Sequence, residues 1–125
     1  MDAARLAGQV SVVTGGALGI GGGISRRLAA AGGQCTTVIG DIREPEVVSL
    51  VAQTALNVAG ARIDILVNNV GDFRPAARDF LHSTEDQWQQ LYELNLLHVL
   101  RMSHALLPAM IQRGRGAVVN NAAWA

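Results

Sequence analysis

The chain has 125 residues, enough for one domain with a real core, and half of them are hydrophobic. Ten basic residues balance ten acidic ones, so no basic field attracts nucleic acid or an anionic membrane. All ten basic residues are arginine, and the single cysteine excludes an internal disulfide. We expect one cytoplasmic domain over residues 1–125, with no metal site, no signal peptide and no stretch long enough to span a membrane.

A strand, a glycine-rich turn and a helix follow one another near the start of the chain. The apolar run Val10–Val13 is typical of a parallel strand that is covered on both faces. Ile20–Ala31 has a helical pattern and is stopped by two glycines. Between them lies Thr14-Gly15-Gly16-Ala17-Leu18-Gly19-Ile20-Gly21.

Three glycines of this turn have distinct expected roles. Gly15 allows a tight turn out of the strand, Gly19 lets the backbone approach a pyrophosphate, and Gly21 lets the helix pack close to the strand. The N–H groups at the start of the helix then face the phosphates. Taken alone, the loop fits nucleotide binding and a plain tight turn equally well.

Strands and helices continue to alternate along the rest of the chain. The predicted elements are a strand over Thr36–Ile39 that leads to Asp41, a helix over Val47–Val58 that Pro45 opens, a strand over Ile63–Asn68, a loop over Asn69–Pro75, a long helix over 85–112 and a last strand over Ala117–Asn120. Thr84 and Gln87 have the spacing of a capping box. The long helix is apolar on two sides, which predicts burial against the sheet and against another helix or subunit.

This alternation predicts an α/β fold with right-handed crossovers. We expect a truncated doubly wound parallel sheet of the Rossmann type, with about four strands and helices on both faces.

Several motifs then coincide in order, and with them the chain resembles the short-chain dehydrogenase/reductase family. The glycine loop matches that family's TGxxxGxG pattern, and Leu66–Gly71 resembles its LVNNAG segment with Val70 in place of alanine. Asp41-Ile42 resembles the family's acidic residue at a strand end, which touches the adenine. Gly116–Asn120 resembles the strand that leads to the catalytic serine. The resemblance spans nearly all of this chain, but the first half of a usual family member.

The resemblance implies hydride transfer between NAD or NADP and a small-molecule alcohol or carbonyl. It implies cofactor contacts at Gly15, Gly19, Ile20, Gly21, Asp41, Ile42, Asn69, Val70 and Gly71. Asn95 occupies the position of the mid-helix catalytic asparagine, which holds a water in a proton relay; the alternative is a helix kink satisfied by backbone. The long helix over 85–112 implies a possible homo-oligomer.

The residues that perform the family's proton transfer are missing. A serine, a tyrosine and a lysine work together there, and the lysine lowers the pKa of the tyrosine four residues before it. This chain has one tyrosine, Tyr92, which is followed four residues later by Leu96, and it has no lysine. The serine position is Ala123. We therefore expect that this chain alone is not catalytically competent.

The stretch between Gly15 and Asp41 is also short. It has room for one helix and one strand, so one βα unit, on the order of 20 residues, is absent relative to the family. Asp41 resembles the later, adenine-contacting acid by its neighbours. By distance from the glycine loop it fits a ribose-binding acid, provided that its strand pairs beside the first one. A carboxylate there repels a 2′-phosphate, which slightly favours NAD over NADP.

Two alternatives belong to other classes of function. One is a non-catalytic module that binds a nucleotide or a partner. The other is a non-functional gene remnant with an internal deletion and an early stop.

Overall fold

The computed structural model describes residues 5–32, 36–58, 60, 62–72 and 79–122. In chain order its elements are strand β1 (Ser11–Val13), helix α1 (Gly19–Ala30), helix α2 (Pro45–Val58), strand β2 (Ile65–Asn68), a 3-10 turn (Phe80–His82), helix α3 (Glu85–Tyr92), a π-turn (Glu93–Leu97), helix α4 (His98–Arg113) and strand β3 (Ala117–Asn120).

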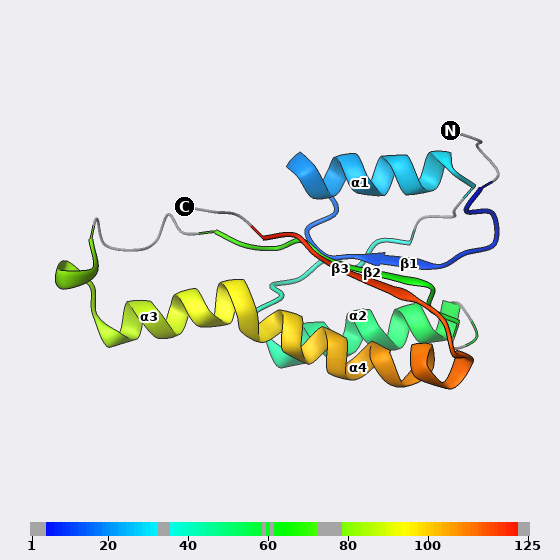
Figure 1. Ribbon diagram of the computed structural model, residues 1–125. Helices are drawn as coiled ribbons and strands as arrows, with labels where there is room; N and C mark the ends of the chain where they lie inside the picture. The colour runs from blue at the N-terminus through cyan, green and yellow to red at the C-terminus, as the bar shows by residue number, and fades with distance from the viewer. Residues whose placement is uncertain (1–4, 33–35, 59, 61, 73–78, 123–125) are drawn as a thin grey trace.

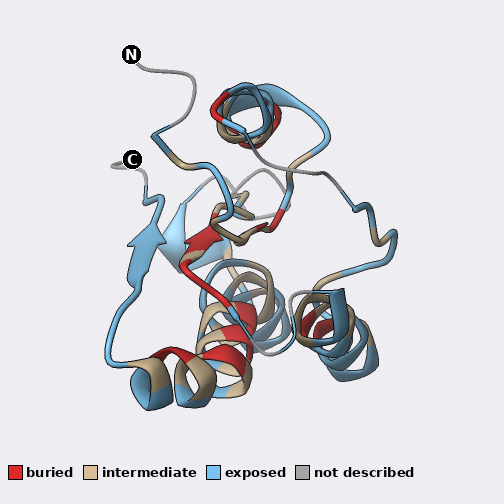
Figure 2. Cartoon of the chain, turned by 90° about the vertical axis from the view of Figure 1, so that its right-hand side faces the viewer, coloured by how far each residue is buried: buried red, intermediate tan, exposed pale blue. Residues whose placement is uncertain are grey.

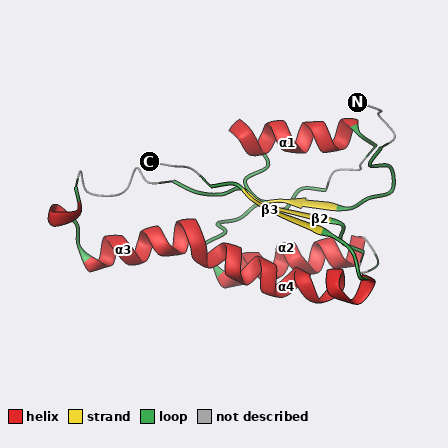
Figure 3. Cartoon of the chain, in the orientation of Figure 1, coloured by secondary structure: helices red, strands yellow, loops and turns green. Residues whose placement is uncertain are grey.

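The strands form a parallel sheet in the order β1-β2-β3. Helix α1 covers one face of this sheet, and α2 and α4 lie against the other face (Figure 1). The colouring by secondary structure in Figure 3 shows the same two helical layers with the strands between them. This arrangement confirms the predicted α/β fold with helices on both faces.

The predicted strand over Thr36–Ile39 does not form. Its backbone pairs with no strand in the described part of the chain, and the Ile39 side chain is 91% exposed. Its β-branched residues favour an extended backbone, but a strand also needs a hydrogen-bonding neighbour. The residue that follows this segment, Gly40, lies against α2 instead of the sheet. It packs so closely on Val47 that a Cβ at Gly40 would lie 2.8 Å from Val47 Cγ1. The described sheet therefore has three of the four expected strands.

The predicted long helix forms over Glu85–Arg113, with a π-turn at its centre. The capping box is present: the Thr84 hydroxyl accepts from the Gln87 N–H at 3.3 Å, and Gln87 Oε1 accepts from the Thr84 N–H at 3.0 Å. Gly114 ends the helix in the left-handed conformation, with φ of 72°. Beyond the edge of the sheet, Phe80 stacks on Trp88 of α3 with ring centroids 5.4 Å apart.

Contrary to the expectation from the sequence, this helix is long and apolar enough to cross a membrane. Its 29 residues contain a window with mean hydropathy of 1.2, of which 22% is buried in the protein. Core helices of soluble proteins meet the same criterion of length and composition. Here the inner side of α4 packs against α2 and β2, through Met102, Leu106 and Met110.

The core lies between the sheet and the layer formed by α2 and α4. Its buried members are Val12, Val48, Ala52, Ile63, Leu66, Met102, Leu106 and Met110. All four residues of β3 are exposed, and Figure 2 shows this strand in pale blue at the side of the sheet. On the face of the sheet away from α2 and α4, helix α1 packs on β1. That face is therefore less covered than the face under α2 and α4.

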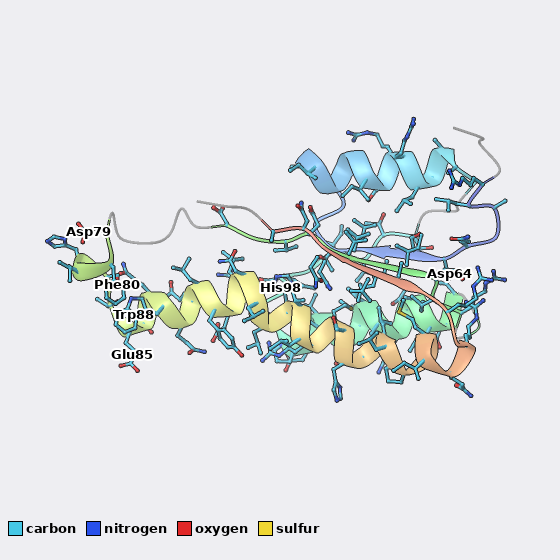
Figure 4. All side chains as sticks on the ribbon, in the orientation of Figure 1. Asp64, Asp79, Phe80, Glu85, Trp88 and His98 are labelled. Atoms are coloured by element: carbon cyan, nitrogen blue, oxygen red, sulfur yellow. The ribbon has the colours of Figure 1, made fainter. Side chains whose placement is uncertain are left out.

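A buried carboxylate joins three elements at the amino-terminal end of β2. Asp64 Oδ2 accepts from the Val10 N–H at 2.9 Å, and Asp64 Oδ1 accepts from Arg113 Nη1 at 2.9 Å. Arg62 Nε donates to the same carboxylate at 3.3 Å. Burial alone would raise the pKa of Asp64, but these three bonds outweigh it and lower the pKa below 3.8. Figure 4 shows this group at the end of the sheet opposite to the carboxyl ends of the strands.

We predict that Asp64→Asn lowers the free energy of unfolding by about 2–3 kcal/mol, because it leaves Arg113 without its buried charge partner. The measurement is urea unfolding at pH 7. Since the folded pKa is depressed, the contribution of Asp64 is full above pH 3.8 and is lost as the pH falls through the lower folded value.

Asp41→Asn is the matched control, since Asp41 also has a lowered pKa but pairs with Arg43 at the surface. We expect a loss below about 0.5 kcal/mol for this variant. Equal losses for the two variants would contradict a structural role for Asp64.

Candidate functional site

The carboxyl ends of the three strands meet at one edge of the sheet, and hydrogen bonds join them. Thr14 follows β1; its N–H donates to the Val67 carbonyl at 3.1 Å, and its hydroxyl accepts from the Asn69 N–H at 3.0 Å. The Thr14 hydroxyl therefore fixes the start of the loop that follows β2. The sequence alone indicates no separate role for Thr14, although this residue opens the glycine motif.

Asparagine side chains extend this connection to β3. Asn68 Nδ2 donates to Asn120 Oδ1 at 2.9 Å, and Asn121 Nδ2 donates to Asn69 Oδ1 at 2.9 Å. Asn68 is 2% exposed. The signal in the sequence was that Asn68-Asn69 and Asn120-Asn121 each end a predicted strand. Only the hydrogen-bonded pairing of β2 with β3 brings these asparagines together.

The glycine loop lies against this asparagine cluster. A Cβ on Gly21 would overlap the Gly15 carbonyl and Asn69 Nδ2, and a Cβ on Gly15 would lie 3.0 Å from Val70 Cγ2. Gly15 and Gly19 have φ of 63° and 56°, the left-handed region that favours glycine. Close packing at Gly21 and the turn at Gly15 thus agree with the sequence analysis.

Gly19 faces open space. Apart from Gly19 itself, its two chain neighbours and the nearby backbone of its own helix, no described atom lies within 4 Å of the position that its Cβ would take. Helix α1 begins here without a side-chain cap, and its first turn contains no acidic residue. Its first N–H groups and the positive end of the helix dipole are therefore available to an anion. Ile20, beside it, is 69% exposed.

The loop after β2 is tied to the π-turn of the long helix. Asn95 Nδ2 donates to the Asp72 carbonyl at 2.8 Å, and Asn95 Oδ1 accepts from the Asp72 N–H at 2.9 Å. Asn95 Nδ2 also reaches the Leu91 carbonyl at 2.9 Å, and a Cβ on Gly71 would lie 3.0 Å from Asn95 Oδ1. The bonds of Asn95 are thus to backbone, as in the helix-kink interpretation, and its catalytic role stays a prediction.

His98 makes a second connection between this helix and the loop, and the sequence analysis missed it. Its side chain is fully buried, and its Nε2 lies 3.0 Å from the Val70 carbonyl (Figure 4). Burial lowers the pKa of His98, while the carbonyls of Val70 and Leu94 offset part of that effect. The ring is therefore neutral at pH 7, with the proton on Nε2 donated to Val70. The spacing of three residues from Asn95 was the signal available in the sequence.

Asp41 forms a salt bridge with Arg43. Arg43 Nη2 donates to Asp41 Oδ2 at 2.6 Å, and the Arg43 N–H donates to Oδ1 at 3.0 Å. These bonds lower the pKa of Asp41. Because Thr36–Ile39 does not pair with β1, the condition for the ribose interpretation of Asp41 is not met. Ile42, the next residue, packs against the core.

The catalytic positions remain incomplete. Tyr92 is 40% exposed at the end of α3, and position 123 lies outside the described residues. Within the described ranges, no cluster of His, Cys, Asp or Glu could hold a metal ion.

We predict that Gly21→Ala lowers the free energy of unfolding by about 2–3 kcal/mol, because its methyl group overlaps the backbone of Gly15. Gly23→Ala is the matched control two residues along the same helix. Apart from its chain neighbours and its own helix backbone, no described atom lies within 4 Å of its Cβ position, so this variant should stabilise the protein by about 1 kcal/mol. Chemical unfolding of both variants measures the difference, and a stabilising Gly21→Ala would contradict the close contact.

We also predict that His98→Leu destabilises the protein and that His98→Gln, which can still donate to Val70, restores part of the loss. The pKa of His98 is lower in the folded chain than its ordinary 6.5, so acidification below 6.5 favours the unfolded state. Urea unfolding between pH 7 and 5 should show a steeper loss for the natural chain than for His98→Gln. Identical pH dependence in the two proteins would contradict this assignment.

Known proteins resemble this chain in sequence and in fold. A sequence model of the family described as short chain dehydrogenase matches residues 33–125. The oxidoreductase UcpA of Escherichia coli K12 is 32% identical over 138 residues, which cover 92% of this chain and 51% of UcpA. The 3-oxoacyl-[acyl-carrier-protein] reductase FabG of Vibrio cholerae is 29% identical, and the match covers 93% of this chain and 55% of FabG.

Among solved structures, a short-chain dehydrogenase from Streptomyces avermitilis superposes with a TM-score of 0.79 at 32% identity. This match covers 90% of the present chain and 49% of that one. The chain thus spans about half the length of the relatives it matches. The UcpA alignment runs over 138 residues, more than the 125 of this chain, so UcpA carries residues here that the chain lacks. By the matched region and the fold, the chain belongs to the short-chain dehydrogenase family.

Proposed function

We propose that this chain binds a nicotinamide dinucleotide at the carboxyl edge of its sheet, as the nucleotide-binding part of a short-chain oxidoreductase. The observation that carries the proposal is the contact of Gly21 with Gly15 and Asn69, beside the open backbone of Gly19. Two loops from different strands are thereby held together at an uncapped helix start. A tight turn without a ligand would require neither the close contact at Gly21 nor the open space at Gly19.

In this proposal each part of the edge contacts one part of the cofactor. The N–H groups at the start of α1, with Gly15, Gly19, Ile20 and Gly21, bind the pyrophosphate. Asn69, Val70 and Gly71 contact the cofactor from the loop after β2. His98 and Asn95 hold that loop through the Val70 carbonyl and the backbone of Asp72.

Asp41 and Ile42 would contact the adenine end of NAD or NADP. A preference for NAD requires the Asp41 carboxylate beside the ribose, where it would repel a 2′-phosphate. Because Thr36–Ile39 pairs with no described strand and Arg43 Nη2 lies 2.6 Å from that carboxylate, we assign no preference between NAD and NADP.

The family's chemistry is hydride transfer between the nicotinamide and a small-molecule alcohol or carbonyl, and the bound cofactor supplies the hydride chemistry. These 125 residues contain no lysine, and Tyr92 is followed by Leu96 at the fourth position. The general acid and the charge that would activate it are absent from them. We therefore propose that this chain by itself binds the cofactor in the cytoplasm without turning over substrate.

A partner-binding role has its own support in the long helix. Trp88, Tyr92, Leu96 and Leu100 recur at intervals of four residues and are each 40–51% exposed. Large exposed apolar patches mark interaction sites or cause aggregation. We propose self-association through this side of the helix as the second candidate function, and general aggregation without cofactor binding would favour the gene-remnant interpretation.

The first test is titration of the purified chain with NADH, followed by nicotinamide fluorescence and by calorimetry, with NAD as competitor. We expect saturable binding at or below millimolar cofactor. Gly19→Asp should weaken binding at least tenfold, because it places a negative charge beside the phosphates. Gly19→Asn is the matched control, since asparagine has the same size and also tolerates a positive φ.

Two results would contradict the proposal. Absence of binding at millimolar NAD and NADP would remove nucleotide binding. Clear reduction of any member of a panel of aldehydes and ketones with NADPH or NADH would overturn the statement that this chain alone does not turn over substrate.

A further inference from the structure

Strand β1 is an edge strand of the described sheet, because it pairs with β2 on one side and with no described strand on the other. On the side that faces β2, the Val10 carbonyl accepts from the N–H groups of Asp64 and Ile65 at 2.9 and 3.1 Å. The Thr14 N–H donates to the Val67 carbonyl on the same side. Alternate residues of a parallel strand present their backbone groups to opposite sides. Ser11 and Val13 therefore point away from β2, and no described residue pairs with their backbone N–H and C=O groups.

A groove runs along this free edge. It has a volume of about 430 Å³ and lies between β1 and α1. Ser11 and Val13 contribute from the strand, and Ser25, Leu28 and Ala29 contribute from the helix. None of the described residues that line it carries a charge. A groove with a free strand edge on one wall and a neutral lining is suited to an extended, uncharged segment.

The chain also carries such a segment without a partner. Thr36–Ile39 consists of β-branched residues, which favour an extended backbone, and it pairs with no strand in the described ranges. Thr36 lies at the groove, and the Ile39 side chain is 91% exposed. Among the described residues, each copy therefore has both a strand edge and a β-branched segment that pair with no other strand.

We propose that the β1 edge is an interface between two copies of this chain, in which Thr36–Ile39 of one copy adds a strand beside Ser11 and Val13 of the other. Exchange in both directions is a closed two-fold arrangement, so each copy loses its free edge. The neutral groove and the zero net charge of the chain present no repulsion to a second copy. This inference is independent of nucleotide binding and of the apolar side of the long helix.

The first experiment measures molar mass by light scattering after size exclusion, from 1 to 100 μM, in a Leu100→Glu background that disrupts association through the long helix. We expect a dimer whose dissociation constant rises at least tenfold in Ile39→Glu. Residue 39 is exposed, so this change leaves the folded monomer unaltered. Ser11→Pro is the second variant, because it removes an N–H that points away from β2 and leaves the β1–β2 ladder intact.

A cross-link then distinguishes this pairing from other contacts. In a Cys35→Ser background, Ser11→Cys and Val38→Cys variants are purified separately, mixed and oxidised. A disulfide between the two different variants supports the exchange. A disulfide within the Ser11→Cys variant alone, a monomer throughout the concentration series, or a dimer that Ile39→Glu leaves unchanged would each overturn the proposal.

Discussion

The hydrogen-bonded pairing of β2 with a strand on each side is the constraint on which the other features depend. At its amino-terminal end, Asp64 accepts bonds from Val10 and Arg113 and so joins β1 and α4. At its carboxyl end, Asn69 is bonded to Thr14 and Asn121. The charged contacts of Asp64 therefore stabilise the fold at the amino-terminal end of β2. The uncharged contacts of Asn69 lie at the carboxyl end, where the candidate site is.

The candidate site is well organised where a pyrophosphate would bind. The overlap that a side chain at Gly21 would cause requires a glycine there, and this contact fixes the glycine loop on the loop after β2. Helix α4 supports that second loop through His98, and the π-turn before it supplies Asn95. A π-turn interrupts the regular helical bonding, and it is often found at functional sites. These 125 residues contain no lysine, so the Tyr–Lys pair of the family's proton transfer is missing from them.

The same chain leaves much apolar and backbone surface uncovered. All of β3 is exposed, one side of the long helix carries large apolar side chains, and the edge of β1 has free backbone groups. Domains of this kind usually cover such surfaces with further strands, helices or subunits. Association between copies is therefore a physical expectation for this chain and is compatible with nucleotide binding at the carboxyl ends of the strands.

The sequence by itself determined the parts that depend on local backbone chemistry. The glycine turn, the capping box at Thr84, the helices and three of the strands were predicted, because each follows from nearby residues and their periodicity. Only the tertiary structure decided the fate of Thr36–Ile39 and the role of His98. A strand requires a partner, and a histidine acquires its role from what surrounds it; both come from residues distant in the sequence.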